Sequence, residues 1–99
     1  MTDFDYRAID DVIHSRVRLA IMSYLMTAGS ADFTALKKET KVSDGNLSTH
    51  LSKLEANGYV IVEKSFVDKK PQTTVRVSDT GREKFKAYVD SLAALIGTA

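Results

Sequence analysis

Hydrophobic residues recur three and four positions apart through most of the first 57 residues, the spacing that places them on one face of an α-helix. One helix is expected to begin after Ser15, which can cap it, and to end at Gly29. The next helix is expected to begin at Ser30 or Asp32. This part of the chain therefore predicts two consecutive amphipathic helices with a short break between them.

The first eleven residues are acidic and carry a smaller apolar face. Four acidic residues and one basic residue give them a net charge of −3, so the rest of the chain carries +4 of the total of +1. The apolar face predicts a short helix capped by Asp3 or Asp5, with the hydrophobic residues Ile9, Val12 and Ile13. Arg18, in the following helix, is expected to brace this segment by pairing with Asp11, the alternative being a phosphate contact.

The stretch 43–57 predicts a helix whose two faces differ sharply. Ser43 can cap it and Gly58 can end it. The buried face is made by Leu47, Leu51 and Leu54. The opposite face has short hydrogen-bonding side chains in place of the long charged ones of an ordinary solvated helix: Asp44, Asn46, Ser48, Thr49, His50 and Lys53. A major groove presents donors and acceptors that such side chains can reach.

After Gly58 the period changes from 3.6 residues to 2. Residues 59–66 and 73–78 are rich in β-branched and aromatic residues and predict two strands. Between them, residues 67–72 contain two lysines and the only proline in the chain, which predicts a hairpin with a six-residue basic tip. Ser78 can then cap a last helix over about 79–96, with the apolar stripe Phe85, Tyr88, Val89, Leu92, Leu95 and Ile96.

The order of these elements predicts a mainly α fold with a small β-hairpin wing. Two helices joined by a tight turn form a helix-turn-helix unit, and a hairpin placed directly after its second helix is a wing. We expect one winged-helix domain over residues 1–99, with a three-helix core and a terminal dimerisation helix. The recognition helix is expected over about 43–57, the wing over 59–78 and the C-terminal helix over 79–96.

The candidate DNA contacts come from the recognition helix and the wing. Gly45 lowers helix propensity, and its missing side chain would let the backbone approach a phosphate or a base. Lysines at the wing tip would act as point charges on phosphate. The candidates are Ser43, Asp44, Gly45, Asn46, Ser48, Thr49, His50, Lys53, Lys69, Lys70 and Arg76.

Composition restricts the other function classes. The chain has no cysteine, so a disulfide framework, a thiol nucleophile and a thiolate metal site are excluded. No apolar run approaches the ~20 residues of a membrane span. We expect a cytoplasmic protein without a membrane segment, a metal or another cofactor.

The segments "SDGNLSTHLSKLEANGYV", "DKKPQTT" and "VSDTGREKF" resemble the winged helix-turn-helix of MarR-like transcriptional regulators, and in particular the short stand-alone regulators of about a hundred residues. The resemblance runs from about Ile13 through Phe85. It implies a transcriptional regulator that binds double-stranded DNA as a homodimer through its outer helices. A small-molecule effector, which larger MarR proteins bind beside longer terminal helices, has no support in these short segments.

A dimer is also expected for two reasons. A single small module makes few DNA contacts. In addition, the apolar faces of the first and last predicted helices need a surface to pack against. The residues expected to form the interface are Ile9, Val12, Ile13, Val89, Leu92, Leu95 and Ile96. Two recognition helices about 34–36 Å apart would read an inverted repeat, and occlusion of a promoter makes a repressor the simplest regulator.

Three other functions remain as alternatives. An enzyme is disfavoured because His14 and His50 lie on different helices and no nucleophile or phosphate-loop motif accompanies them. Metal sensing is disfavoured by the lack of cysteine. A winged-helix protein-interaction module is the strongest alternative, although such modules tend to carry large apolar or acidic residues where this chain has Ser48, Thr49 and Lys53.

Overall fold

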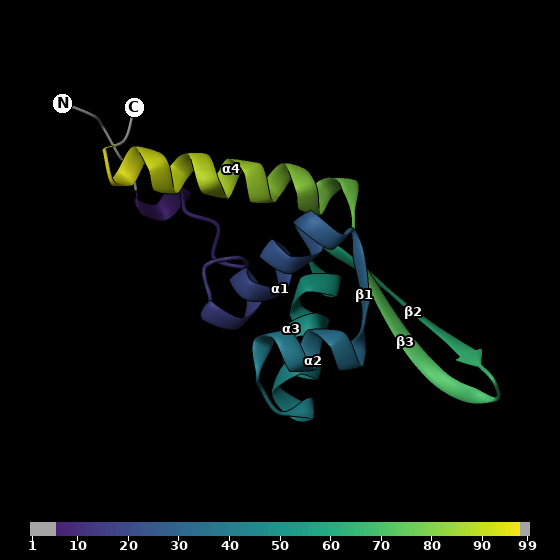
Figure 1. Ribbon diagram of the computed structural model, residues 1–99. Helices are drawn as coiled ribbons and strands as arrows, with labels where there is room; N and C mark the ends of the chain where they lie inside the picture. Colours follow the sequence, from purple (N-terminus) through teal and green to yellow (C-terminus); the bar gives the residue numbers. More distant parts are fainter. Residues whose placement is uncertain (1–5, 98–99) are drawn as a thin grey trace.

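Four helices and a three-stranded antiparallel sheet make up the fold in the computed structural model, which describes residues 6–97 (Figure 1). A short 3-10 helix precedes them at Tyr6–Ala8. In chain order the elements are α1 (Arg16–Ala28), β1 (Ser30–Asp32), α2 (Phe33–Thr40), α3 (Asp44–Ala56), β2 (Val60–Val67), β3 (Lys70–Val77) and α4 (Asp79–Leu95). The expected winged helix is confirmed.

Side-chain caps define where the helices begin, as the sequence predicts. Ser15, Asp32, Ser43 and Ser78 each accept a hydrogen bond from the backbone N–H three residues later, which satisfies a donor that the first helical turn leaves unpaired. Of the two caps proposed for α2, Asp32 is the one used, at 2.7 Å from the Ala35 nitrogen.

The predicted first α-helix is wrong. Beyond the 3-10 helix, residues 9–15 form turns, in which Asp10 Oδ1 accepts from the backbone N–H groups of Val12 at 2.8 Å and Ile13 at 3.1 Å. A short side chain that bonds to nearby backbone competes with helix formation, and this segment is too short to offset the cost of nucleation. The proposed caps Asp3 and Asp5 lie outside the described residues.

The N-terminal segment is nevertheless tied to the domain. Asp10 Oδ2 accepts from the Tyr59 hydroxyl at 2.5 Å, and Arg18 Nε donates to the Val12 carbonyl. Burial raises the pKa of Tyr59, and the hydrogen bond to Asp10 raises it further. The expected bracing role of Arg18 is therefore correct, but its partner here is the Val12 carbonyl in place of the Asp11 carboxylate.

The sheet differs from the expected hairpin in two ways. Residues 30–32 form a third strand beside β3, giving the order β1-β3-β2, with Ser30 opposite Arg76. A strand of three residues is too short to show alternation in sequence. The predicted six-residue tip is also wrong, because the strands extend until only Asp68 and Lys69 form the turn, with φ of 52° and 65°.

Pro71 therefore lies within β3, opposite Phe66. In a two-residue hairpin the pair next to the turn exchanges hydrogen bonds and the following pair does not, so the N–H that proline lacks would have pointed away from β2. β1 pairs with β3 only from Thr74 to Arg76 and does not reach this point. The missing donor thus leaves no pairing unmade.

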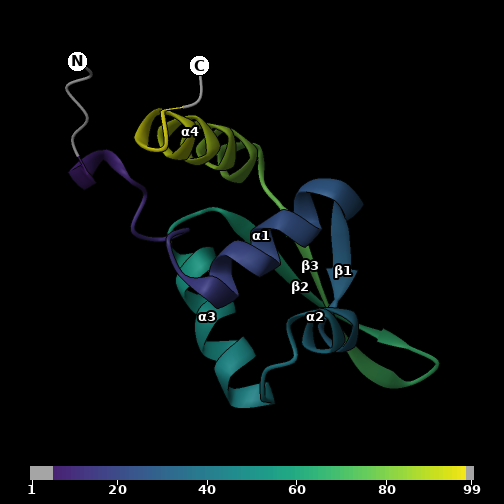
Figure 2. The same ribbon diagram turned by 60° about the vertical axis from the view of Figure 1, so that its left-hand side comes forward.

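One hydrophobic core joins the helices to the base of the sheet. Its buried residues are Ile13, Ile21, Met22, Leu25, Leu36, Leu47, Leu51, Leu54, Tyr59, Val60, Val75, Val77 and Tyr88. In both ribbon views α4 and the 3-10 helix lie at one end of the molecule, and the start of α3 and the tip of the hairpin lie at the other (Figures 1 and 2). The fold therefore separates the expected dimerisation helix from the expected recognition surface.

Candidate nucleic-acid interface

The outward face of α3 is built as the sequence predicts. Leu47 and Leu54 are completely buried and Leu51 is 5% exposed, which fixes the rotation of the helix about its axis. The exposed side of the helix then presents Asp44, Gly45, Asn46, Ser48, Thr49, Ser52 and Lys53. Ser52 is absent from the sequence-based candidates, although its position four residues after Ser48 is the signal that places both on one face.

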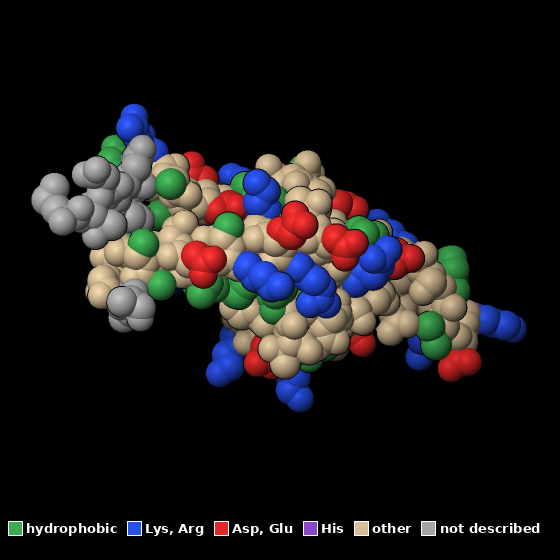
Figure 3. Space-filling model, turned by 90° about the horizontal axis from the view of Figure 1, so that it is seen from above, with side chains coloured by type: hydrophobic (Ala, Val, Ile, Leu, Met, Phe, Trp, Pro, Cys, Tyr) green, Lys and Arg blue, Asp and Glu red, His purple; other side chains and the backbone are tan. Residues whose placement is uncertain are grey.

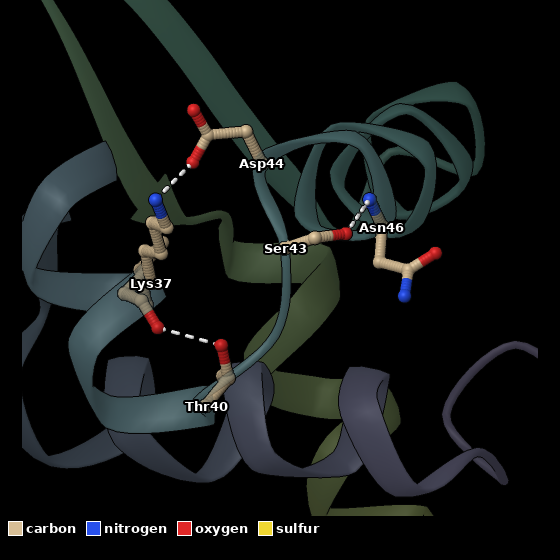
Figure 4. A network of polar contacts seen from close by, with 6 residues as sticks. Lys37, Thr40, Ser43, Asp44 and Asn46 are labelled. Carbon is tan, nitrogen blue, oxygen red and sulfur yellow. Dashed lines mark hydrogen bonds and ion pairs between the residues drawn. The ribbon is translucent and has the colours of Figure 1, made fainter.

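Asp44, at the turn between α2 and α3, forms an ion pair with Lys37. Its Oδ1 lies 2.7 Å from Lys37 Nζ on α2, so the two charges offset each other beside the first turn of α3 (Figure 4). Ser43 Oγ accepts from the Asn46 backbone N–H at 3.2 Å, and the Asn46 side chain extends away from this ion pair (Figure 4). An acidic residue at this position therefore repels phosphate less than its isolated charge suggests.

Gly45 and Thr49 lie one turn apart on this face. Thr49 Oγ1 donates to the Gly45 carbonyl at 2.9 Å, so its hydroxyl hydrogen is already used within the helix. Its methyl group and the oxygen lone pairs remain for contacts with another molecule. Apart from its chain neighbours and the backbone of its own helix, no described atom lies within 4 Å of where a Gly45 side chain would begin, so internal packing does not require glycine there.

His50 lies on the flank of α3 that faces α1. Its Nδ1 is 2.9 Å from a guanidinium nitrogen of Arg18. Arginine can only donate, so Nδ1 accepts and the neutral ring carries its proton on Nε2. Partial burial lowers the pKa of His50, and the positive charges of Arg18 and Lys53 lower it further. His50 therefore offers a neutral N–H donor near pH 7.

The wing places its basic residues at two levels. Lys69 and Lys70 are exposed at the turn. Arg76 lies at the other end of β3, where its Nε is 3.2 Å from Glu63 Oε1 on β2, with half of the Arg76 side chain exposed. Arg76 therefore makes a cross-strand ion pair, and of the proposed wing contacts only the two lysines lie at the tip.

A groove of about 470 Å³ runs between α3 and the wing. Its wall on the α3 side is formed by Asp44, Ser48, Leu51, Ser52 and Glu55, and its other side by Phe33, Val62, Lys64 and Thr73. Lys64 and Thr73 lie opposite each other on β2 and β3. The sequence gives no signal for them, because only strand register determines that these residues face α3.

The residues proposed for dimerisation do not share one environment. On α4, Val89 is 47% and Leu95 49% exposed and Leu92 is half-buried, and Ile96, which caps the end of the helix, is 70% exposed. Figure 3 looks down on α4 and shows hydrophobic side chains towards the left-hand end of the view, with acidic and basic side chains along the middle. Ile9 and Val12 are half-buried against the core.

The prediction that Ile13 belongs to the dimer surface is wrong. Its side chain is completely buried in the core of its own chain, so it has no surface to offer a second copy. Asp10 draws the segment into a turn that points this residue inward.

Comparison with known proteins identifies the family. The sequence model of the winged helix DNA-binding domain matches residues 17–96. The chain belongs to this family. An uncharacterized protein of Methanocaldococcus jannaschii is 33% identical over 84 residues, which cover 85% of this chain and 91% of that protein.

Solved structures agree with this membership. A transcriptional regulator homologue from Pyrococcus horikoshii OT3 is 36% identical, covers 87% of this chain and 85% of its own, and superposes with a TM-score of 0.82. A putative MarR-family regulator from Enterococcus faecalis V583 is 20% identical with a TM-score of 0.75 over 99% of this chain and 91% of its own, which shows the shared fold. The predicted resemblance to winged-helix transcriptional regulators is confirmed, and the fold is shared with the MarR-family structure. Family and fold are those of transcriptional regulators rather than of enzymes.

Among residues 6–97, no helix is long and apolar enough to cross a lipid bilayer.

Proposed function

We propose that this winged-helix regulator binds a specific sequence of double-stranded DNA as a cytoplasmic homodimer, represses transcription by covering a promoter, and has no catalytic role. The observation that carries the proposal is the outward face of α3, which presents short polar side chains beside a lysine-tipped wing. A protein-interaction module tends to have large apolar or acidic residues where this chain has Ser48, Thr49 and Lys53. Asp44, the one acidic residue in the first turn of this face, is paired with Lys37.

Some groups on the α3 face suit phosphate contacts, which would position the protein on DNA, and others suit base contacts, which would read the DNA sequence. Ser43, Gly45 and the first-turn backbone N–H groups suit a phosphate at a helix N-terminus. Asn46 can pair with an adenine edge, the Thr49 methyl group can contact the methyl group of thymine, and Lys53 can reach guanine or phosphate. Ser48 and Ser52 can donate or accept, and His50 can donate from Nε2.

A second copy would meet the first at the end of the molecule opposite this face. The exposed apolar residues of α4 belong to the helix face that contains the buried Tyr88, continued past the body of the domain. Pairing of Val89, Leu92, Leu95 and Ile96 with the same residues of a second copy would give a two-fold interface and point both α3 helices the same way. Ile9 and Val12 would lie at its margin.

DNA binding can be tested by removing the two lysine charges of the wing while keeping the backbone of its turn. The double variant Lys69→Gly/Lys70→Gln removes two charges, and glycine adopts the positive φ of position 69 without strain. We expect weaker binding to every duplex sequence and a slope of log affinity against log salt that is smaller by about 2, because each phosphate contact contributes about 0.9. Binding isotherms at several salt concentrations measure this slope.

The matched control is Lys84→Gln/Lys86→Gln, which removes the same charge from exposed positions of α4. It is expected to change the slope by much less, because these residues lie at the opposite end of the molecule. Equal slopes for the two double variants would show that the wing lysines make no phosphate contacts.

A further inference from the structure

The wing exposes an aromatic ring that the fold itself does not use. Phe66 is 76% exposed and is absent from the hydrophobic core and from the residues packed against it. A large apolar side chain that stays exposed near the end of a projecting hairpin has a cost in water that burial in the core does not offset.

Strand register determines the side on which Phe66 lies. Residues 60, 62, 64 and 66 alternate onto one face of β2, and Val60 on that face is buried in the core while Val62 and Lys64 line the groove beside α3. Phe66 therefore lies on the α3 side of the wing. Pro71 is directly opposite it on β3, so the two side chains lie on the same face of the hairpin.

The charged residues of the wing indicate which kind of molecule Phe66 contacts. Lys64 shares its face of β2, and Lys69 and Lys70 lie at or beside the turn with Asp68. The other acidic residue of the wing, Glu63, lies on the opposite face of β2 and pairs with Arg76. An apolar ring that shares its face with Lys64 and lies near Lys69 at the turn suits a polyanion with an apolar interior better than a neutral or basic protein surface. A DNA minor groove, with phosphates along its edges and sugars and bases on its walls and floor, is such a surface.

The length of β2 from Val62 to Phe66 is similar to the spacing between adjacent DNA grooves. Four residues separate Val62, beside α3, from Phe66, which is about 13 Å along a strand. The minor groove next to an occupied major groove lies about half a helical turn away, roughly 17 Å. The groove between α3 and the wing then lies where the sugar-phosphate strand between the two DNA grooves would pass.

We propose that Phe66, opposite Pro71, enters the minor groove beside each half-site and selects A·T base pairs there. This inference rests on the proposed DNA-binding function and adds a specificity-determining residue to it. In the minor groove only guanine adds an amino donor, and an apolar ring covering that donor would leave it without a hydrogen-bond partner. Apolar side chains are used at minor-groove steps in this way.

The test is a selection from a random duplex library with the wild-type protein and two variants, Phe66→Ser and Val67→Ser. Val67 is the matched control, because it is the next residue, is 50% exposed and lies on the opposite face of the wing. The wild-type protein and Val67→Ser should select A·T pairs about 5 base pairs from the centre of each half-site. Phe66→Ser should keep the central motif, lose this flanking preference and bind A·T-flanked sites about tenfold more weakly.

Four results would overturn the inference. If Phe66→Ser selects the same flanks as the wild type, or if Val67→Ser loses them equally, Phe66 does not read the minor groove. If Phe66→Ser instead dissociates a dimer, the ring is covered by a second copy. If the wild-type protein recovers no motif, the proposed function fails together with this inference, which separates that outcome from the first.

Discussion

Gly81→Ala is expected to destabilise the protein by about 3 kcal/mol, more than any other single methyl group added to its glycines. A side chain at position 81 would begin 2.1 Å from the Tyr59 carbonyl oxygen and 3.1 Å from a methyl carbon of Val77. Neither the backbone of Tyr59 nor the buried Val77 can move freely. Relief requires α4 to shift away from the core, which also breaks the bond from the Ser78 N–H to that carbonyl.

Thermal unfolding at fixed protein concentration measures this effect. A loss of this size lowers the midpoint by on the order of 15 °C for a domain of about 100 residues. Thr80→Ala, at the exposed preceding position, should leave the midpoint nearly unchanged. An unchanged midpoint for Gly81→Ala would mean that the start of α4 does not pack against Tyr59.

Gly45→Ala is the informative counterpart, because the same substitution meets open space. It is expected to keep or raise stability, by up to about 1 kcal/mol, since alanine favours helix over glycine. Its cost should appear in DNA affinity, where the added methyl group separates the first turn of α3 from the duplex.

The second large effect is expected at the dimer surface. The double variant Leu95→Asp/Ile96→Asp places two charges where 49% and 70% exposed apolar side chains would be covered by the same residues of a second copy. It should yield a folded monomer, because neither residue is in the core. Affinity for an inverted repeat should fall by at least about a hundredfold, since two linked half-sites no longer bind together.

Sedimentation and duplex titration measure the two consequences separately. Ala94→Asp is the control, because it adds a charge to the same helical turn on the opposite flank of α4. It should remain dimeric and bind DNA as the wild-type protein does. A double variant that stays dimeric would place the interface elsewhere.

Local signals explain why so much of this fold could be predicted. Ser15, Asp32, Ser43 and Ser78 each place a helix start within a residue, because a capping bond spans only three positions. The outward face of α3 was predictable from Leu47, Leu51 and Leu54, which fix one side of the helix.

The errors concern features set by contacts between distant segments. β1 exists because Ser30–Asp32 pairs with β3 more than forty residues later, and three residues carry no period. Pro71 suggested a loop, but it is accommodated because β1 does not extend beside it. Ile13 was predicted to contact a second copy, but hydrogen bonds made by Asp10 and Arg18 hold its segment against the domain. Lys64 and Thr73 line the groove beside α3 only because of the register of the hairpin.

Specific DNA recognition is tested most directly by a selection of bound sequences from a random duplex DNA library at near-physiological salt. We expect recovery of an inverted repeat whose half-sites lie one helical turn apart, about 34–36 Å, because a two-fold dimer would place one α3 helix in each major groove. Recovery of no motif, or binding that is independent of sequence and lost as salt rises, would contradict specific recognition by the α3 face.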